Sequence, residues 1–129
     1  MLLDTSGLLC LQHRDEPLHD RACSLYREAK QPVVHNYILA EYVALVTARR
    51  LPRSLAIAFI SDIAVDPNVR TIWVDRDLHD RAIELLLARS DKTYSVCDAV
   101  SFLVMRDRGI QEALTTDRHF EQEGFIRKL

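Results

Sequence analysis

The sequence predicts an α/β fold in which helices cover both faces of a central, mostly parallel sheet. Short apolar runs alternate along the chain with longer segments whose apolar residues recur at helical spacing. The chain has only three glycines and four prolines, which is few for a protein built from tight hairpins. Strands separated by one or two helices pair in parallel, because such a connection has to cross the sheet. We expect a single domain spanning residues 1–129.

Five short apolar segments are the candidate strands. They are bounded by polar or turn-forming residues, and several are rich in β-branched side chains. In chain order they are residues 1–3 (MLL), Pro32–His35 (PVVH), Thr71–Val74 (TIWV), Ala113–Thr116 (ALTT) and, as an edge strand, residues 125–129 (FIRKL). Ligands of parallel sheets bind beyond the carboxyl ends of the strands, so we expect the functional site there.

Helices are predicted in the intervals between these segments. One begins at Thr5 or Ser6, and Asn36 is the expected N-cap of another that runs to about Arg50. The remaining helices are predicted over His19–Lys30, over Arg53–Ala64, after a cap at Asp75 or Asp77, and from Ser95 to a glycine C-cap near Gly109.

Composition excludes several classes of protein. The formal net charge is −2, so nucleic-acid binding would need a local basic patch. The three cysteines form no C-x-x-C pair, which favours free thiols in a reducing compartment over a disulfide framework or a zinc site. No apolar run approaches the roughly 18 residues of a membrane span, and the first residues lack the features of a signal peptide. We therefore expect a cytoplasmic protein.

Four carboxylates stand where a site would form. Asp4 and Asp117 each follow a predicted strand, and Asp98 lies in the first turn of a helix. Glu41 is the only charged residue of the apolar stretch NYILAEYVALV, where a carboxylate is costly unless it is paired, hydrogen-bonded or bound to a metal. Simpler explanations exist for each residue: helix caps for the three aspartates and an ion pair with an arginine for Glu41.

One explanation covers all four carboxylates. Converging in one cleft, they would repel one another unless a cation neutralised them. Carboxylate oxygens without histidine or cysteine ligands favour Mg²⁺ or Mn²⁺ over zinc. A frequent use of such a site is metal-assisted hydrolysis of a phosphodiester bond.

The order and context of these acids resemble the PIN-domain family, most closely the toxin subunits of VapBC-type toxin–antitoxin pairs. The resembling segments span essentially the whole chain: LLDTSGLL, NYILAEYVAL, SVCDAVSFLVM and ALTTDRHFEQEGF. The resemblance implies a PIN-like three-layer sandwich with a sheet of about five strands. It also implies an endoribonuclease that needs Mg²⁺ or Mn²⁺ and cleaves RNA to 5′-phosphate and 3′-hydroxyl ends. Such toxins are commonly homodimers that a cognate antitoxin inhibits.

The family's catalytic and metal-binding positions carry over to the four acids, Asp4, Glu41, Asp98 and Asp117. Nearby hydroxyl residues fit the supporting positions: Thr5, Ser6, Ser101 and Thr116. Several arginines are candidates for RNA binding: Arg49, Arg50, Arg53 and Arg118. Exposed apolar residues of the two helices predicted over His19–Lys30 and Arg53–Ala64 are candidates for antitoxin binding.

Two further residues near the acids are expected to be structural. Metal-assisted hydrolysis does not require a histidine, so His119 is interpreted as a structural residue. Cys97 adjoins Asp98, but successive helical residues point about 100° apart, and Cys97 is interpreted as a core residue.

A haloacid-dehalogenase-type phosphatase would need an aspartate where Ser6 stands, and a response regulator would need an acidic pair near Asp4. A PIN-like binding module without catalysis remains the alternative.

Overall fold

A computed structural model describes residues 1–129 and contains one five-stranded sheet. The strands lie in the order β3-β2-β1-β4-β5, and every neighbouring pair is parallel. Their bounds are β1 Leu2–Leu3, β2 Val33–His35, β3 Arg70–Ile72, β4 Glu112–Leu114 and β5 Ile126–Arg127. All five predicted strands are present, with β5 at an edge as expected.

The central strand β1 has both of its faces covered. Side chains of successive strand residues point to opposite faces of a sheet, and Leu2 and Leu3 are both fully buried. Helices therefore pack on both faces, as the apolar character of these strands predicts. In the register of β1 with β4, Leu2 pairs with Ala113 and Leu3 with Leu114. This register brings Asp4 and Thr115, the next residue of each strand, to the same edge of the sheet.

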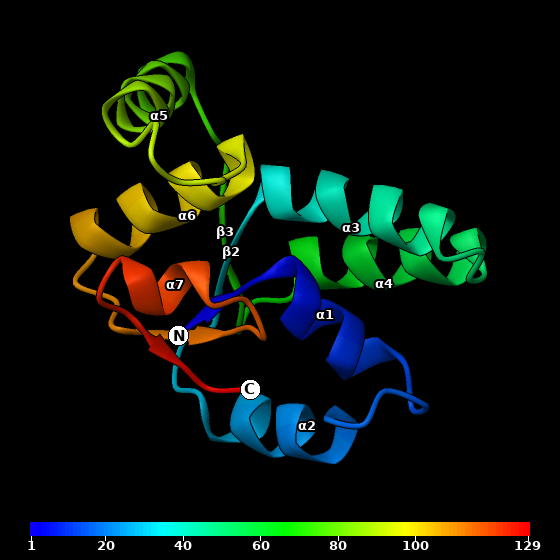
Figure 1. Cartoon of the computed structure of the whole chain (residues 1–129). Coiled ribbons are helices and arrows are strands. Elements are labelled where there is room, and N and C mark those ends of the chain that lie inside the picture. Colours follow the sequence, from blue (N-terminus) through cyan, green and yellow to red (C-terminus); the bar gives the residue numbers. More distant parts are fainter.

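Seven helices surround this sheet. They are α1 Thr5–Gln12, α2 His19–Glu28, α3 Asn36–Ala48, α4 Arg53–Val65, α5 Arg76–Ala88, α6 Val96–Asp107 and α7 His119–Gln122. Figure 1 shows α3 and α4 side by side on one flank and α5 packed against α6 on the other. None of these helices has the length and apolar character needed to cross a membrane.

Some predicted helix ends were wrong. The N-cap of α3 is His35, whose Nδ1 accepts a hydrogen bond from the Ile38 N–H at 3.3 Å. Asn36 instead accepts a hydrogen bond from the Val74 N–H at 2.8 Å, which ties the start of α3 to the segment after β3. The same helix ends at Ala48, two residues early, because Arg50 adopts a left-handed backbone with φ 57°.

The caps of the two later helices agree with the sequence prediction. Asp75 caps α5 by accepting a hydrogen bond from the Leu78 N–H at 2.9 Å. Helix α6 starts with a capping box between Ser95 and Asp98, and Gly109 follows its C-terminus with φ 64°.

Gly7 lies where α1 crosses the sheet. A Cβ atom at this position would stand 2.0 Å from the backbone oxygen of Leu114 in β4. No side chain fits such a gap, so α1 approaches β4 this closely only because residue 7 is glycine.

Candidate metal centre

An open cleft of about 710 Å³ lies beyond the carboxyl ends of β1 and β4. All four predicted acids line this cleft: Asp4, Glu41, Asp98 and Asp117. They reach it from the end of β1, the middle of α3, the first turn of α6 and the loop after β4. Residues separated by more than a hundred positions in the chain thus line the same cleft, at the sheet edge that the parallel topology predicts.

Asp4 is the most deeply buried of the four acids, with 6% of its surface exposed. It is the N-cap of α1, and its Oδ2 accepts hydrogen bonds from the hydroxyls of Ser6 at 2.9 Å and Thr115 at 2.7 Å. Burial raises the pKa of Asp4 to about 6, although both hydroxyls oppose this shift. A carboxylate this costly to ionise is one that a nearby cation would stabilise strongly.

Thr115, which was not among the predicted site residues, links Asp4 to Asp117. Its hydroxyl donates to Asp4 and accepts a hydrogen bond from the Asp117 N–H at 2.9 Å. Thr116 is exposed, and its backbone N–H donates to the Ser6 hydroxyl at 2.9 Å. Thr116 also lines the cleft, but its hydroxyl makes no hydrogen bond to a carboxylate. The supporting roles expected of Thr116 and Ser6 stay predictions.

Glu41 projects from α3 into the cleft and accepts a hydrogen bond from the Thr5 hydroxyl. No lysine or arginine lies within 4.0 Å of its carboxylate, so the ion pair considered for Glu41 does not form. Thr5 orients this carboxylate, as its position beside Asp4 suggested. The Glu41 carboxylate is therefore still available to a metal ion or to water, which is its other predicted role.

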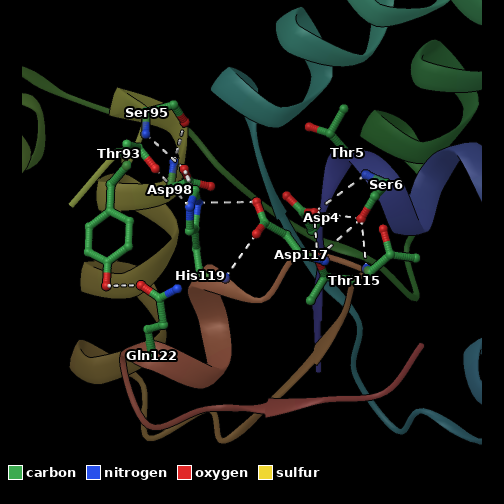
Figure 2. Close-up of polar contacts among 12 residues, drawn as sticks. Asp4, Thr5, Ser6, Thr93, Ser95, Asp98, Thr115, Asp117, His119 and Gln122 are labelled. Atoms are coloured by element: carbon green, nitrogen blue, oxygen red, sulfur yellow. Dashed lines mark hydrogen bonds and ion pairs between the residues drawn. The ribbon is translucent and has the colours of Figure 1, made fainter.

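Asp98 has two structural partners. Its Oδ2 accepts the Ser95 N–H at 2.8 Å, and the Ser95 hydroxyl accepts the Asp98 N–H at 3.0 Å. The same Oδ2 also lies 3.3 Å from Nδ1 of His119. The capping box fixes this carboxylate at the start of α6, and its exposed side faces the cleft (Figure 2).

Asp117 faces Asp98 across the ring of His119 (Figure 2). Its Oδ1 accepts the His119 N–H at 2.9 Å, and its Oδ2 lies 3.3 Å from His119 Nδ1. One ligand atom each from Asp98, Asp117 and His119 fall within 4.8 Å of one another. Asp4 and Glu41 line the same cleft but belong to no group this tight.

Ser101 does not support the acids. It is fully buried on α6, and its hydroxyl lies 2.8 Å from Nε2 of His35. The prediction was wrong because Ser101 is one turn from Asp98 but points into the core, where it meets β2. Burial lowers the pKa of His35 to about 3, so this histidine is neutral.

The predicted RNA-binding arginines divide into two groups. Arg49 lines the cleft, where it forms an ion pair with Glu16 at 2.9 Å. The other three are exposed but do not line the cleft: Arg50, Arg53 and Arg118. Arg49 is therefore the one cation in this set that lies beside the acids.

Cys97 is buried, as expected of a core residue. Burial raises the pKa of its thiol, and the neighbouring carboxylates of Glu41, Asp4 and Asp98 raise it further. A thiol in this environment stays protonated and is a poor nucleophile.

The donor set fits a divalent metal ion. Oxygens of Asp98 and Asp117 lie close together, and Asp4 lines the same cleft. Hard carboxylate oxygens are the ligands that Mg²⁺ and Mn²⁺ prefer.

Known proteins resemble this chain over nearly its whole length. The chain is 35% identical over 128 residues to the 23S rRNA-specific endonuclease VapC20 from two Mycobacterium tuberculosis strains, CDC 1551 / Oshkosh and ATCC 25618 / H37Rv. The match covers 98% of this chain and 95% of that protein. A crystal structure of M. tuberculosis VapC20, described as a Sarcin-Ricin loop cleaving toxin, superposes with a TM-score of 0.88 at 32% identity. That superposition covers 97% of this chain and 95% of the other. Residues 1–125 match the PIN domain, and the chain belongs to the PIN-domain family.

Proposed function

We propose that the protein is an endoribonuclease that uses Mg²⁺ or Mn²⁺ and acts as the toxin of a type II toxin–antitoxin pair. The observation that carries the proposal is the convergence of four carboxylates in one cleft, at the carboxyl ends of parallel strands. The full-length likeness to VapC20, an endonuclease, supports the same activity. PIN nucleases depend on metal ions, and the acidic group described above is suited to one.

The four acids divide the work according to their contacts. Asp98, Asp117 and Asp4 would hold the metal directly or through water, with their carboxylates fixed by Ser95, His119 and Thr115. These three hydrogen bonds matter because they hold the metal-binding carboxylates in one orientation. A bound metal ion would activate water and stabilise negative charge on the phosphate.

Glu41 is suited to a different task. Thr5 donates to one of its oxygens, and no cation neutralises the carboxylate. In this proposal Glu41 would bind the metal or accept the proton of the attacking water. Water would then bond to phosphorus as the 3′ oxygen leaves and takes a proton from solvent, so that the products carry 5′-phosphate and 3′-hydroxyl ends.

The substrate proposed is a structured RNA, with 23S ribosomal RNA first among the candidates. VapC20 is named for cleaving 23S rRNA, and the fold of this chain follows that protein closely. Arg49 at the cleft, with Arg50 and Arg53 nearby in the chain, would contact RNA phosphates.

A cleavage assay tests the proposal. Purified protein is incubated with intact ribosomes and with total RNA, with EDTA and then with Mg²⁺ or Mn²⁺ restored, and the new 5′ ends are mapped. We expect metal-dependent cleavage by the wild type and none by Asp98→Asn. RNA binding without cleavage under every condition would instead support the alternative of an inactive PIN-like binding module.

The proposed partners are a cognate antitoxin and a second copy of the chain. An apolar cavity of about 230 Å³ lies between α1, α2 and α4, and is lined by Leu11, Cys23, Tyr26, Arg27, Phe59 and Ile63. The exposed part of this cavity is suited to apolar side chains of an antitoxin segment. It includes residues of the two helices predicted for this contact.

Cys23→Glu tests the cavity by placing a charge in its wall, and Ser24→Glu adds the same charge next to it on α2. The partner for this test is the antitoxin that we expect a short reading frame immediately upstream of the gene to encode. We expect Cys23→Glu to weaken inhibition by about tenfold or more, with cleavage retained, and Ser24→Glu to be inhibited normally. Equal inhibition of both variants would move the antitoxin site elsewhere. Light scattering of the isolated protein tests the homodimer.

A further inference from the structure

His119 lies between two of the acids rather than beside them. Its Nδ1 is 3.3 Å from Oδ2 of Asp98 and 3.3 Å from Oδ2 of Asp117 (Figure 2). The two carboxylates come from different elements, the start of α6 and the loop after β4. A single ring nitrogen therefore faces two acids that the proposed function assigns to a metal.

These spacings suit a shared ion better than a pair of hydrogen bonds. A single N–H that points between two acceptors makes two bent, weakened hydrogen bonds, because its direction favours neither oxygen. An ion with octahedral bonds of about 2.1 Å holds adjacent ligand atoms about 3.0 Å apart. The atoms of Asp98, Asp117 and His119 lie within 4.8 Å of one another, which a single coordination sphere accommodates with a small inward shift.

The imidazole is held in this orientation from its other side. Nε2 lies 3.3 Å from the Thr93 hydroxyl, and the ring of Tyr94 packs edge-on at 5.0 Å. Tyr94 is itself fixed, because its hydroxyl donates at 2.9 Å to Glu123, whose side chain is 1% exposed and pairs with Arg89. A proton on Nε2 that is donated to Thr93 leaves the lone pair of Nδ1 directed at the two acids.

We propose that His119 is a direct ligand, through Nδ1, of the ion bound by Asp98 and Asp117. The inference rests on the proposed function and refines its metal site. The site then has one nitrogen and two carboxylate ligands in place of oxygen ligands alone. Mg²⁺ prefers oxygen, whereas first-row transition ions accept imidazole more readily, so His119 makes the site selective for Mn²⁺ over Mg²⁺.

Pulsed electron paramagnetic resonance of the Mn²⁺-loaded full chain tests the ligation without relying on activity. A directly bound nitrogen gives a hyperfine coupling that changes when the histidines are labelled with ¹⁵N. We expect this coupling in the wild type and in His79→Gln, which alters a histidine bonded to Tyr37 outside the cleft. We expect its loss in His119→Gln.

Calorimetric titration tests the selectivity. His119→Gln is expected to weaken Mn²⁺ binding by about tenfold or more and to change Mg²⁺ binding much less. Labelling the wild type needs no mutation, so a variant that fails to fold does not prevent the test.

The outcomes separate the two proposals. Mn²⁺ binding that requires Asp98 but shows no nitrogen coupling overturns the role of His119 and leaves the proposed nuclease standing. A protein that binds neither ion and cleaves no RNA overturns both.

Discussion

The hydroxyl oxygens of Ser6 and Thr115 lie 3.1 Å apart although the residues are 109 positions apart in the chain. Both hydroxyls donate to the same oxygen of Asp4. The contact exists because β1 and β4 pair in parallel and end together. It joins the first and last parts of the chain at the cleft and gives the buried Asp4 carboxylate two hydroxyl donors, which lower its pKa against the larger effect of burial.

Asp4→Asn is expected to stabilise the metal-free protein at neutral pH while abolishing cleavage. The folded pKa of Asp4, about 6, exceeds its ordinary value of 3.8, so folding opposes ionisation. The resulting gain in the free energy of unfolding is up to about 3 kcal/mol above pH 6 and vanishes below pH 3.8. Urea unfolding in EDTA across this range measures the difference. Equal stability of the two proteins at pH 7 would contradict the burial argument.

Thr115→Val and Thr116→Val separate two neighbouring hydroxyls. Removing the Thr115 hydroxyl takes a donor from Asp4 and an acceptor from the Asp117 N–H, so cleavage should fall by about tenfold or more. Thr116→Val, which alters an exposed side chain without a carboxylate contact, should cleave like the wild type. Initial rates at saturating metal compare the two variants. A greater loss of cleavage rate in Thr116→Val than in Thr115→Val would support the role that the sequence predicts for Thr116.

Ser95→Ala and Asp98→Asn divide capping from chemistry at the start of α6. Ser95→Ala loses the side-chain half of the capping box, which costs about 1 kcal/mol of stability, yet leaves the acids in place. Asp98→Asn still accepts the Ser95 N–H but lacks the charge, so cleavage should fall on the order of a hundredfold or more. In thermal unfolding, Ser95→Ala should lose more stability than Asp98→Asn. In rate measurements, Asp98→Asn should lose more activity than Ser95→Ala.

The arginines near the cleft are expected to govern the salt dependence of RNA binding. Replacing Arg49, Arg50 and Arg53 together by Gln removes up to three phosphate contacts. The slope of log affinity against log salt should then decrease by about 0.7 for each contact to single-stranded RNA. Arg76→Gln removes an exposed charge on α5 and serves as the control. An unchanged slope in the triple variant would place the RNA on another surface. Catalytically inactive Asp98→Asn is the background for these measurements.

His35 should make the protein sensitive to acid, and Asp4 should mask part of the effect. The folded pKa of His35 is about 3, below its ordinary 6.5, so stability is complete above pH 6.5 and is lost as the pH falls toward 3. The slope from this residue is about 1.4 kcal/mol per pH unit. Between pH 3.8 and 6 Asp4 contributes the opposite slope. Asp4→Asn in EDTA should therefore show a steeper loss of stability in acid than the wild type, measured by urea unfolding.

Local signals in the sequence predicted more of the site than non-local ones. The capping box of Ser95 and Asp98 could be predicted because its partners are three residues apart, and the ends of β1 and β4 indicated Asp4 and Asp117. The hydrogen bond from Thr115 to Asp4 could not be predicted, because it depends on the register in which β1 and β4 pair.

His119 and Ser101 show the same limit. The orientation of the His119 ring depends on Thr93 and Tyr94, which precede α6 in the chain, whereas His119 follows it. Ser101 has the helical spacing of a partner for Asp98, but its actual partner, His35, is 66 positions away. Spacing within a helix gives the relative direction of side chains, and only the packing of that helix decides which of them faces the core.

Gly7 gives the cleft a fixed width. Of the three residues directly before it, Thr5 donates a hydrogen bond to Glu41 and Ser6 donates one to Asp4, so this segment holds two of the four acids. A methyl group at position 7 would collide with the backbone of β4 and push α1 outward, carrying these three residues away from Thr115. The spacing of the acids thus depends on the missing side chain of Gly7, a residue that does not line the cleft. Among sequences that share this site, residue 7 should tolerate change less than several of the residues that line the cleft.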